Sequence, residues 1–399
     1  MTTDDNAMGL GTSQIETVTG SENRKSAHLE TPLIVALPVT SQTEQHTLGQ
    51  SLRRYIKNKI SIASPLRPSR VIVRPYGPGE KPRLLANNKI DKRPYLRYIE
   101  STRTLEVLCI PGKDLVKHYA LLIATYYGLD QSEDKRLTQY SLPRKHQCYR
   151  WLHASNLREL GPVETVVLYN VERLGRPSSN PLKFDSKIDD PTRELFDWQI
   201  HRPTNTGIGS RKGPVAILDC NFKFWGDIAA SLVEVLHDLC EVRQVLYIGK
   251  AGSLRDDDEP NTIIATGNDS WIDGAQIIWN NILQHAEDLS PKIQTGSNAS
   301  VYSPLEETHE WLFTWCERCH WVDCEVGNLA LACIKFEISF GYLNIISDNV
   351  AKGHEHDLTN EQLEIVKEKR QELLTVIESV LNHHLGLPPD DKKDGNGMP

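Results

Sequence analysis

Two short segments carry residue types that could do chemistry where a strand ends. The first is Tyr247–Leu254, which reads Tyr-Ile-Gly-Lys-Ala-Gly-Ser-Leu. Gly249 and Gly252 would let backbone amides approach a bound group closely, and Lys250 and Ser253 would act as donors. The same pattern is also typical of an ordinary tight turn, so this segment alone does not establish a site.

The second segment ends in Ser347-Asp348, directly after the apolar run Tyr342–Ile346. In open parallel sheets, ligands bind at the carboxyl ends of the strands, where a carboxylate can contact a ligand or carry a proton. An aspartate at this position could equally cap a following helix. Both interpretations stay open for Asp348.

Between them, Asp323, Cys324 and Glu325 stand immediately before a stretch with small residues that predicts a helix. Two acids at the start of a helix favour the helix dipole, which is the structural explanation for them. The functional explanation is that one or both carboxylates face a ligand.

Taken in order, these segments resemble the nucleoside phosphorylase superfamily. That superfamily has a turn G-x-x-G-[GS]-L after a central strand, a V-[DE]-x-E segment that opens a helix, and a strand that ends in S-D. Here they are Gly249–Leu254, Val322–Glu325 and Ser347-Asp348, and 23 residues separate Glu325 from Asp348. The resemblance covers about residues 213–350. It implies an α/β fold with a mixed, mostly parallel central sheet flanked by helices.

The resemblance also implies cleavage or transfer at the N-glycosidic bond of a purine nucleoside or nucleotide. Glu325 would accept hydrogen bonds from the ribose hydroxyls, and Asp348 would protonate the leaving base. This division suits the chemistry, because cleavage builds positive charge on the sugar and negative charge on the base. The remaining substrate-binding candidates are Gly249, Lys250, Gly252, Ser253, Asp323, Cys324 and Ser347.

The sequence departs from the superfamily at the glycine turn. Phosphorolytic members have an arginine at the position of Tyr247 and a serine at the position of Lys250. A tyrosine cannot clamp phosphate as a guanidinium does, and a lysine would replace the charge only as a point charge. Phosphorolysis, hydrolysis and loss of activity therefore all stay open. A scaffold that binds a nucleotide or RNA, or that runs another transferase reaction, is the alternative.

The elements that would position these residues follow from apolar runs and periodicity. One long loop is expected at Gly175–Pro214, where Pro, Ser, Asn and Gly are frequent. Helices are expected at Lys117–Tyr127, Asp227–Leu239, Asn328–Phe340 and Glu361–Leu381, the last capped from Thr359-Asn360. Strands are expected at Leu33–Leu37, Val71–Val73, Leu105–Ile110, Val163–Tyr169, Val215–Asp219, Val242–Ile248 and Tyr342–Ile346.

Charge divides the chain unevenly. Residues 51–104 hold 14 Lys and Arg against three acids, a charge of +11 that leaves −19 for the rest. This segment could bind phosphates or RNA, or it could be a solvated surface that pairs with the acidic remainder. The predicted organisation is a disordered N-terminus (1–30), a basic extension (31–104), a phosphorylase-like domain (105–385) and a disordered tail (386–399).

Composition indicates the class of protein and the cellular compartment to expect. The 399 residues are 39% hydrophobic and 25% charged, as in ordinary globular proteins. No apolar run reaches the roughly 18 residues of a membrane span, and no signal peptide is evident, so we expect a cytoplasmic protein with reduced thiols. Cys316–His320 matches a haem-attachment pattern, but with one cysteine pair we expect neither metal nor cofactor. A homo-oligomer stays open.

Overall fold

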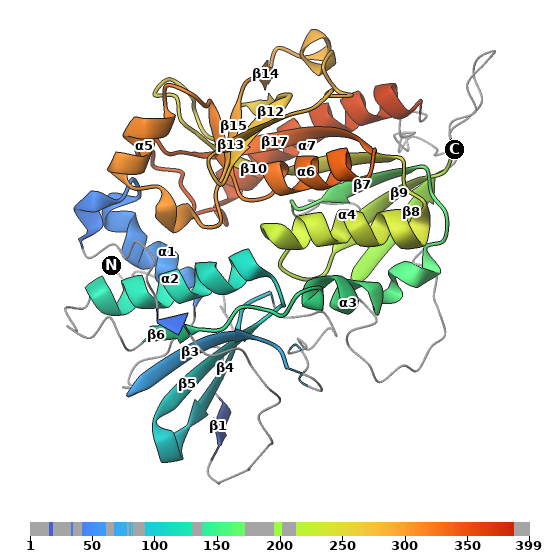
Figure 1. Cartoon of the computed structure of the whole chain (residues 1–399). Coiled ribbons are helices and arrows are strands. Elements are labelled where there is room, and N and C mark those ends of the chain that lie inside the picture. The colour runs from blue at the N-terminus through green and yellow to red at the C-terminus, as the bar shows by residue number, and fades with distance from the viewer. Residues whose placement is uncertain are drawn as a thin grey trace, which may run out of the picture.

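The computed structural model describes residues 16–18, 33–34, 42–60, 68–77, 80, 82, 92–129, 138–171, 195–201 and 213–386. These residues form two sheets with helices between and around them (Figure 1). The first sheet has the strand order β1-β4-β5-β3-β6-β2. Its strands are β1 (Glu16–Val18), β2 (Leu33–Ile34), β3 (Arg70–Pro75), β4 (Tyr95–Ile99), β5 (Thr104–Cys109) and β6 (Thr138–Tyr140). Helices α1 (Leu52–Lys59) and α2 (Lys113–Leu129) accompany it.

The second sheet contains the segments that the sequence resemblance covers. Its centre is a row of four parallel strands, β9, β7, β10 and β17. Its strands are β7 (Thr165–Tyr169), β8 (Phe196–His201), β9 (Val215–Cys220), β10 (Gln244–Ser253), β11 (Ile264–Thr266), β12 (Asp269–Ile272), β13 (Ala275–Ile278), β14 (Ile293–Thr295), β15 (Asn298–Ser300), β16 (Trp321–Asp323) and β17 (Ser339–Asn349). The predicted α/β fold with a mixed, mostly parallel sheet is confirmed. The strands expected from the apolar runs near residues 215, 242 and 342 do share this sheet.

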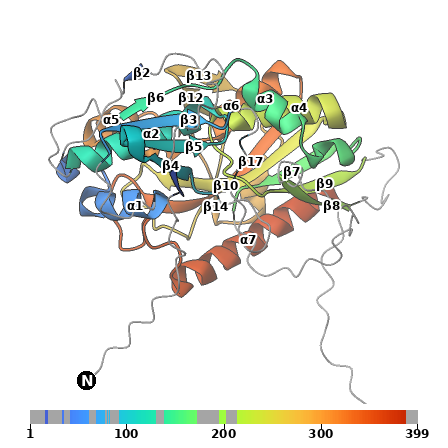
Figure 2. The ribbon, with the colours of Figure 1, turned by 90° about the horizontal axis from the view of Figure 1, so that it is seen from below.

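Helices cover both faces of the second sheet. They are α3 (Gln147–His153), α4 (Asp227–Cys240), α5 (His309–Trp315), α6 (Val326–Lys335) and α7 (Glu364–Leu385). Figure 2 shows α4 on one side of the strands and α7 on the other. The alternation of strand side chains explains this arrangement: in β10, Val245 and Tyr247 join the core with α4 and α6, whereas Leu246 and Ile248 pack with α7. A sheet covered on both faces accounts for the nearly continuous apolar runs of these strands.

The two sheets share one core. Val73 and Leu105 of the first sheet belong to the same buried cluster as Leu122 of α2 and Leu232 of α4. Helix α2 lies between the first sheet and the rest of the molecule in Figure 1. The first sheet is therefore an integrated part of the fold and can contribute to a site on the second.

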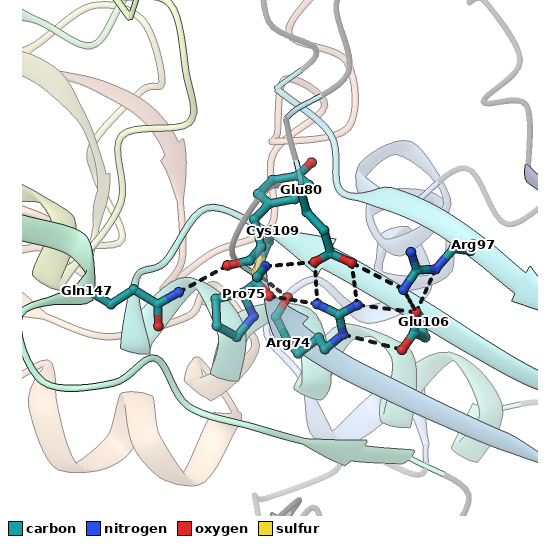
Figure 3. A network of polar contacts seen from close by, with 9 residues as sticks. Arg74, Pro75, Glu80, Arg97, Glu106, Cys109 and Gln147 are labelled. Carbon is teal, nitrogen blue, oxygen red and sulfur yellow. Dashed lines mark hydrogen bonds and ion pairs between the residues drawn. The ribbon is translucent and has the colours of Figure 1, made fainter. Parts of the chain in front are cut away.

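A network of charged side chains crosses three inner strands of the first sheet, β3, β5 and β4 (Figure 3). Arg74 of β3 donates to both carboxylate oxygens of Glu80, at 2.6 and 2.8 Å, and also contacts Glu106 of β5 at 3.3 Å. Arg97 of β4 contacts the same two carboxylates. Burial opposes ionisation of Glu80, but the hydrogen bond from Arg74 and the nearby charges lower its pKa to about 2. This network uses basic residues of the 51–104 segment inside the protein.

Several boundaries differ from those expected. The boundary at residues 104 and 105 falls within β5, whereas the change from the first sheet to the second lies between β6 and β7. Strand β8 lies within the expected loop Gly175–Pro214 and pairs antiparallel with β9. Helix α6 ends at Lys335, and α7 begins at Glu364, after an N-cap, Leu363, that makes no side-chain cap hydrogen bond.

Parts of the expected organisation lie outside the described residues. These are most of segments 1–30 and 175–214, the end of the strand expected at Leu33–Leu37, and the tail after residue 386. Within segment 1–30, β1 pairs with β4. In the part of the chain that is described, no helix has the length and apolar character needed to cross a membrane.

Candidate active site

A cavity of about 780 Å³ opens at the carboxyl ends of the four parallel strands. Tyr169, Asp219, Gly252 and Asp348 reach it from the ends of β7, β9, β10 and β17, respectively. The opposite wall comes from the N-terminal part of the chain and includes Tyr55, Asn58 and Lys59 of α1. Its position is the usual location for a ligand in an open parallel sheet.

Asp348 reaches the cavity because β17 is irregular. Ala251 pairs with Ile346, but the next residue of β10, Gly252, pairs with Asp348, so Ser347 is an extra residue in β17. Ile345 and Ser347 line the cavity by simple alternation, and the bulge adds Asp348 to the same side. Gly252 makes room for this arrangement, because a Cβ there would lie 2.7 Å from Val350 Cγ2 and 3.3 Å from Asp348 Oδ2.

The surroundings of Asp348 favour its protonated form as the pH approaches neutrality. It is only 6% exposed, and burial raises its pKa to about 6 even though Ser347 donates to its Oδ1 at 2.7 Å. Glu307, 5% exposed, lies near enough that burial and the charge of Asp348 raise its own pKa well above the usual range. Two buried acids on one cavity wall disfavour double ionisation, so one of them readily keeps a proton.

Glu325 comes from a different element and faces the same cavity. It is the N-cap of α6, yet its side chain makes no capping hydrogen bond. Its closest polar contact is Tyr247, whose hydroxyl donates to Oε2 at 3.3 Å and accepts from Asn170 Nδ2 at 3.1 Å. Burial and the charge of Asp323 raise the pKa of Glu325 well above its usual range. The hydroxyl of Tyr247 therefore contacts a carboxylate that lines the cavity.

Asp323 and Glu325 differ in the hydrogen bonds that their side chains make within the protein. Asp323 accepts hydrogen bonds from Asn298 Nδ2 at 2.8 Å, Ser300 Oγ at 2.6 Å and the amide of Val326 at 2.8 Å. It thus caps α6 and joins β15 to β16, although it also lines the cavity. Glu325 is the acid of this segment that is left for a ligand.

The glycine turn contributes less than its sequence suggests. Lys250 lines the cavity, but its Nζ lies 2.5 Å from Glu361 Oε1, and Arg370 contacts the same oxygen at 3.0 Å. Ser253 is fully buried and donates to Asp258 at 2.5 Å. Of the predicted binding residues, Lys250, Gly252, Asp323, Cys324, Ser347 and both catalytic candidates line the cavity, and Gly249 and Ser253 do not.

Sequence reasoning missed several cavity residues, among them Lys59, Lys223, Glu307 and Glu361. Lys59 belongs to the segment with charge +11, for which phosphate or RNA binding and a solvated surface both stayed open without a particular lysine being singled out. Lys92 and Arg93 of that segment also line the cavity. The described basic residues thus divide between the cavity, the Arg74 network and the surface, and RNA binding through them stays a prediction.

The cysteine cluster near residue 316 gives no metal site. Cys316 is exposed, whereas Cys319 is buried and donates to the carbonyl of Asn298 at 3.4 Å. In the described part of the chain, no group of three or more His, Cys, Asp or Glu side chains could hold a metal ion. Cys324 lines the active-site cavity, but burial raises the pKa of its thiol well above the usual value.

Comparison with known proteins finds similarity at the level of structure. No protein-family model and no curated protein matches the chain. A futalosine hydrolase mutant of Helicobacter pylori is 14% identical, with a TM-score of 0.37 over 55% of this chain and 100% of the hydrolase. A 5′-methylthioadenosine/S-adenosyl homocysteine nucleosidase of the same organism, complexed with a pyrrolopyrimidine-pyrrolidinol compound, is 14% identical, with a TM-score of 0.38 over 56% of this chain and 99% of the nucleosidase.

The corresponding nucleosidase of Campylobacter jejuni is 11% identical, with a TM-score of 0.37 over 55% of this chain and 99% of its own. These proteins are nucleosidases, and the sequence motifs resemble the superfamily of nucleoside phosphorylases and nucleosidases. Because the TM-scores stay below 0.5, the functional argument rests on the geometry of the cavity.

Proposed function

We propose that the chain hydrolyses the N-glycosidic bond of a purine nucleoside or nucleotide. The observation that carries this proposal is the convergence of Glu325 and Asp348, from a helix start and a bulged strand end, on one cavity of about 780 Å³. A cavity of this size accommodates a ligand as large as a nucleotide. The two acids differ in their surroundings, which suits two different roles.

Asp348 has the properties of a general acid. With a pKa of about 6 it is partly protonated near neutral pH and can donate a proton to a ring nitrogen of the departing base. Protonation neutralises the negative charge that develops on the base as the bond breaks. Ser347 holds one oxygen of the carboxyl group through its hydroxyl, which leaves the other oxygen for the ligand.

Glu325 has the properties of a sugar-binding carboxylate. Burial makes its ionised form costly, and Tyr247 supplies one hydrogen bond at 3.3 Å. Two ribose hydroxyls would supply the donors that the ionised form requires. A charged carboxylate beside the sugar then stabilises the positive charge of the transition state more than it stabilises the ground state.

The glycine turn favours water over phosphate as the attacking group. Its one cationic side chain, Lys250, is already paired with Glu361, whose pKa the surrounding cations lower to about 2 in spite of burial. Tyr247 directs its hydroxyl to Glu325. Neither residue is left to bind a phosphate ion at the turn.

The direct test is release of free base. The full chain is incubated with purine nucleosides and nucleotides, with and without phosphate, and the base and sugar products are separated by chromatography. We expect base together with free sugar or sugar phosphate, and Glu325→Gln and Asp348→Asn should each slow its release. Equal rates for the wild type and both variants, with the fold intact by circular dichroism, would contradict the proposal.

A further inference from the structure

Two lysines line the cavity from α1 and from the segment that follows β9. Lys59 is in the last turn of α1, and Lys223 follows β9; both line the cavity and are partly exposed to it. Among the described residues, neither forms a salt bridge, in contrast to Lys250 in the same cavity. Glu361 acts on Lys59 through its charge but forms no salt bridge with it, and ammonium groups without a direct anionic partner inside a cavity are costly unless a ligand supplies one.

Aromatic rings fix where both ammonium groups lie. Lys223 Nζ is 5.1 Å from the ring centre of Tyr119 and 4.8 Å from that of Trp225, and its closest polar contact is the Tyr119 hydroxyl at 3.4 Å. Lys59 Nζ is 5.2 Å from the ring of Tyr55. Such rings attract a cation and hold it in place without neutralising it.

The two lysines influence each other and the catalytic wall. Burial and then the charge of Lys59 lower the pKa of Lys223 to about 7, and burial lowers the pKa of Lys59 as well. The charge of Glu325 in turn raises the pKa of Lys223, and the charges of Glu361 and Asp348 raise that of Lys59. Both lysines line the same cavity as the two proposed catalytic acids, whereas Lys250 in that cavity is paired with Glu361.

We infer that Lys59 and Lys223 form a subsite for a phosphate group beside the glycosidic cleavage site. Lysine binds phosphate well as a point charge, and two ammonium groups on one wall match a dianion. The phosphate could belong to the substrate, as in a nucleoside monophosphate, or be a free phosphate ion. This inference rests on the proposed function for its reaction, but phosphate binding can be measured without turnover.

The test uses Lys59→Met and Lys223→Met, singly and together, because methionine keeps the length and the apolar stem. Lys57→Met on α1 is the matched control for the first, since Lys57 is exposed and does not line the cavity. Lys117→Met is the control for the second, since Lys117 lies 5.2 Å from the ring of Tyr302 but outside the cavity. Affinities for adenosine, adenosine 5′-monophosphate and inorganic phosphate are measured by calorimetry, and base release is followed in parallel.

If the phosphate belongs to the substrate, the wild type should bind the monophosphate at least 10-fold more tightly than adenosine. Each lysine variant should reduce that advantage roughly 10- to 100-fold, to the point where it disappears, and the controls should keep it. If the phosphate is a free ion, inorganic phosphate alone should bind to the wild type, and the lysine variants should weaken that binding by a similar factor, while base release by water should proceed without it.

Two results would overturn the subsite. One is tighter binding of the monophosphate than of adenosine that persists in the double variant, and the other is that the wild type shows no affinity for either form of phosphate. Failure of the proposed function gives a different result. In that case no base is released from any compound, while the monophosphate still binds through the two lysines.

Discussion

Two regions of this molecule bring acids and cations together away from bulk water, and they do so in opposite ways. In the first sheet, Arg74 lies 2.6 Å from Glu80 and Arg97 contacts the same carboxylate, so every charge has a partner. In the cavity, Glu325 accepts a hydrogen bond from the hydroxyl of Tyr247 at 3.3 Å, and Lys223 donates to the hydroxyl of Tyr119 at 3.4 Å, so both have neutral partners here. The first arrangement stabilises a fold, and the second leaves charges for a ligand.

The pKa values follow the same division. Glu80 is partly buried, yet its cationic neighbours lower its pKa to about 2. Asp348 is buried without comparable compensation, and its pKa rises to about 6. Cationic partners therefore separate the acids that remain ionised from those that can exchange a proton under physiological conditions.

The largest effect is expected from Glu325→Gln. The amide keeps the shape but loses the charge that stabilises the sugar cation, so kcat/KM should fall roughly 30- to 1000-fold. The midpoint of thermal unfolding should not fall, because the substitution removes a carboxyl group that is costly to ionise in the cavity. Glu310→Gln, at an exposed position of α5, is the control. A variant that unfolds more easily but turns over normally would place Glu325 with the structural charges.

Arg74→Met should have the opposite effect, lowering the stability of the protein and leaving its activity unchanged. Removal of the guanidinium leaves Glu80 and Glu106 with only Arg97, which should cost about 3 kcal/mol of unfolding free energy measured in urea. Activity per folded molecule should persist. Arg70→Met is the control, because Arg70 is exposed on the same strand and donates only to Gln139.

The same network predicts the pH dependence of stability. Because folding depresses the pKa of Glu80 from 4.5 to about 2, its contribution is complete above pH 4.5 and is lost as the pH falls toward 2. The difference in unfolding free energy between wild type and Arg74→Met should therefore shrink across that interval. A difference that is constant down to pH 2 would show that pairing with Glu80 is not its cause.

Asp348→Asn should change the pH profile of the reaction as well as its rate. The acid form is required, so kcat/KM of the wild type should fall about 10-fold per unit as the pH rises above about 6. The asparagine variant should lack this decline and release purines roughly 10- to 100-fold more slowly at pH 6. A substrate with an activated leaving group needs no acid and should be much less affected. An unchanged profile in the variant would assign the proton to another group, with Glu307 the nearest candidate.

The smallest effect is expected from Tyr247→Phe. Loss of one long hydrogen bond to Glu325 should lower kcat/KM by a factor of about 5, equivalent to about 1 kcal/mol. Tyr342→Phe is a matched control, because Tyr342 pairs with Tyr247 across the strands and its buried hydroxyl has no hydrogen-bond partner in the described structure. Equal effects of the two variants would mean that the Tyr247 hydroxyl does not position the carboxylate.

The sequence predicted the central strands and the two acids because both leave a local signal. Apolar runs of five to seven residues mark strands that are buried on both faces, and Glu325 and Asp348 stand in short motifs with a fixed order. The extra residue that turns Asp348 into the cavity leaves no such signal, since strict alternation would have placed Asn349 there. The end of α6 leaves no signal in the sequence either. Glu337 adopts a positive φ of 55° where a glycine would have marked the stop.

The lysine subsite could not have been predicted, because it depends on pairing in three dimensions. Composition showed the excess charge of residues 51–104 but not which cations would be neutralised. Arg74 and Arg97 meet acids in the first sheet, whereas Lys59 is carried by α1 to the ends of distant strands. The fold determines which basic side chains pair with an acid, and the remaining ones determine where an anionic ligand can bind.

The contacts that hold α1 beside the cavity join segments that are far apart in the sequence. The Thr47 hydroxyl donates to the carbonyl of Glu307 at 2.7 Å, and Asn58 donates to that of Thr359 at 3.3 Å, across separations of 260 and 301 residues. Contacts over such distances form slowly and late in folding. During synthesis, Lys59 leaves the ribosome long before Asp348 is added, so a nascent chain carries the lysines without the acids. Under the proposed function, turnover therefore requires that α1 and the strand that carries Asp348 are both in place.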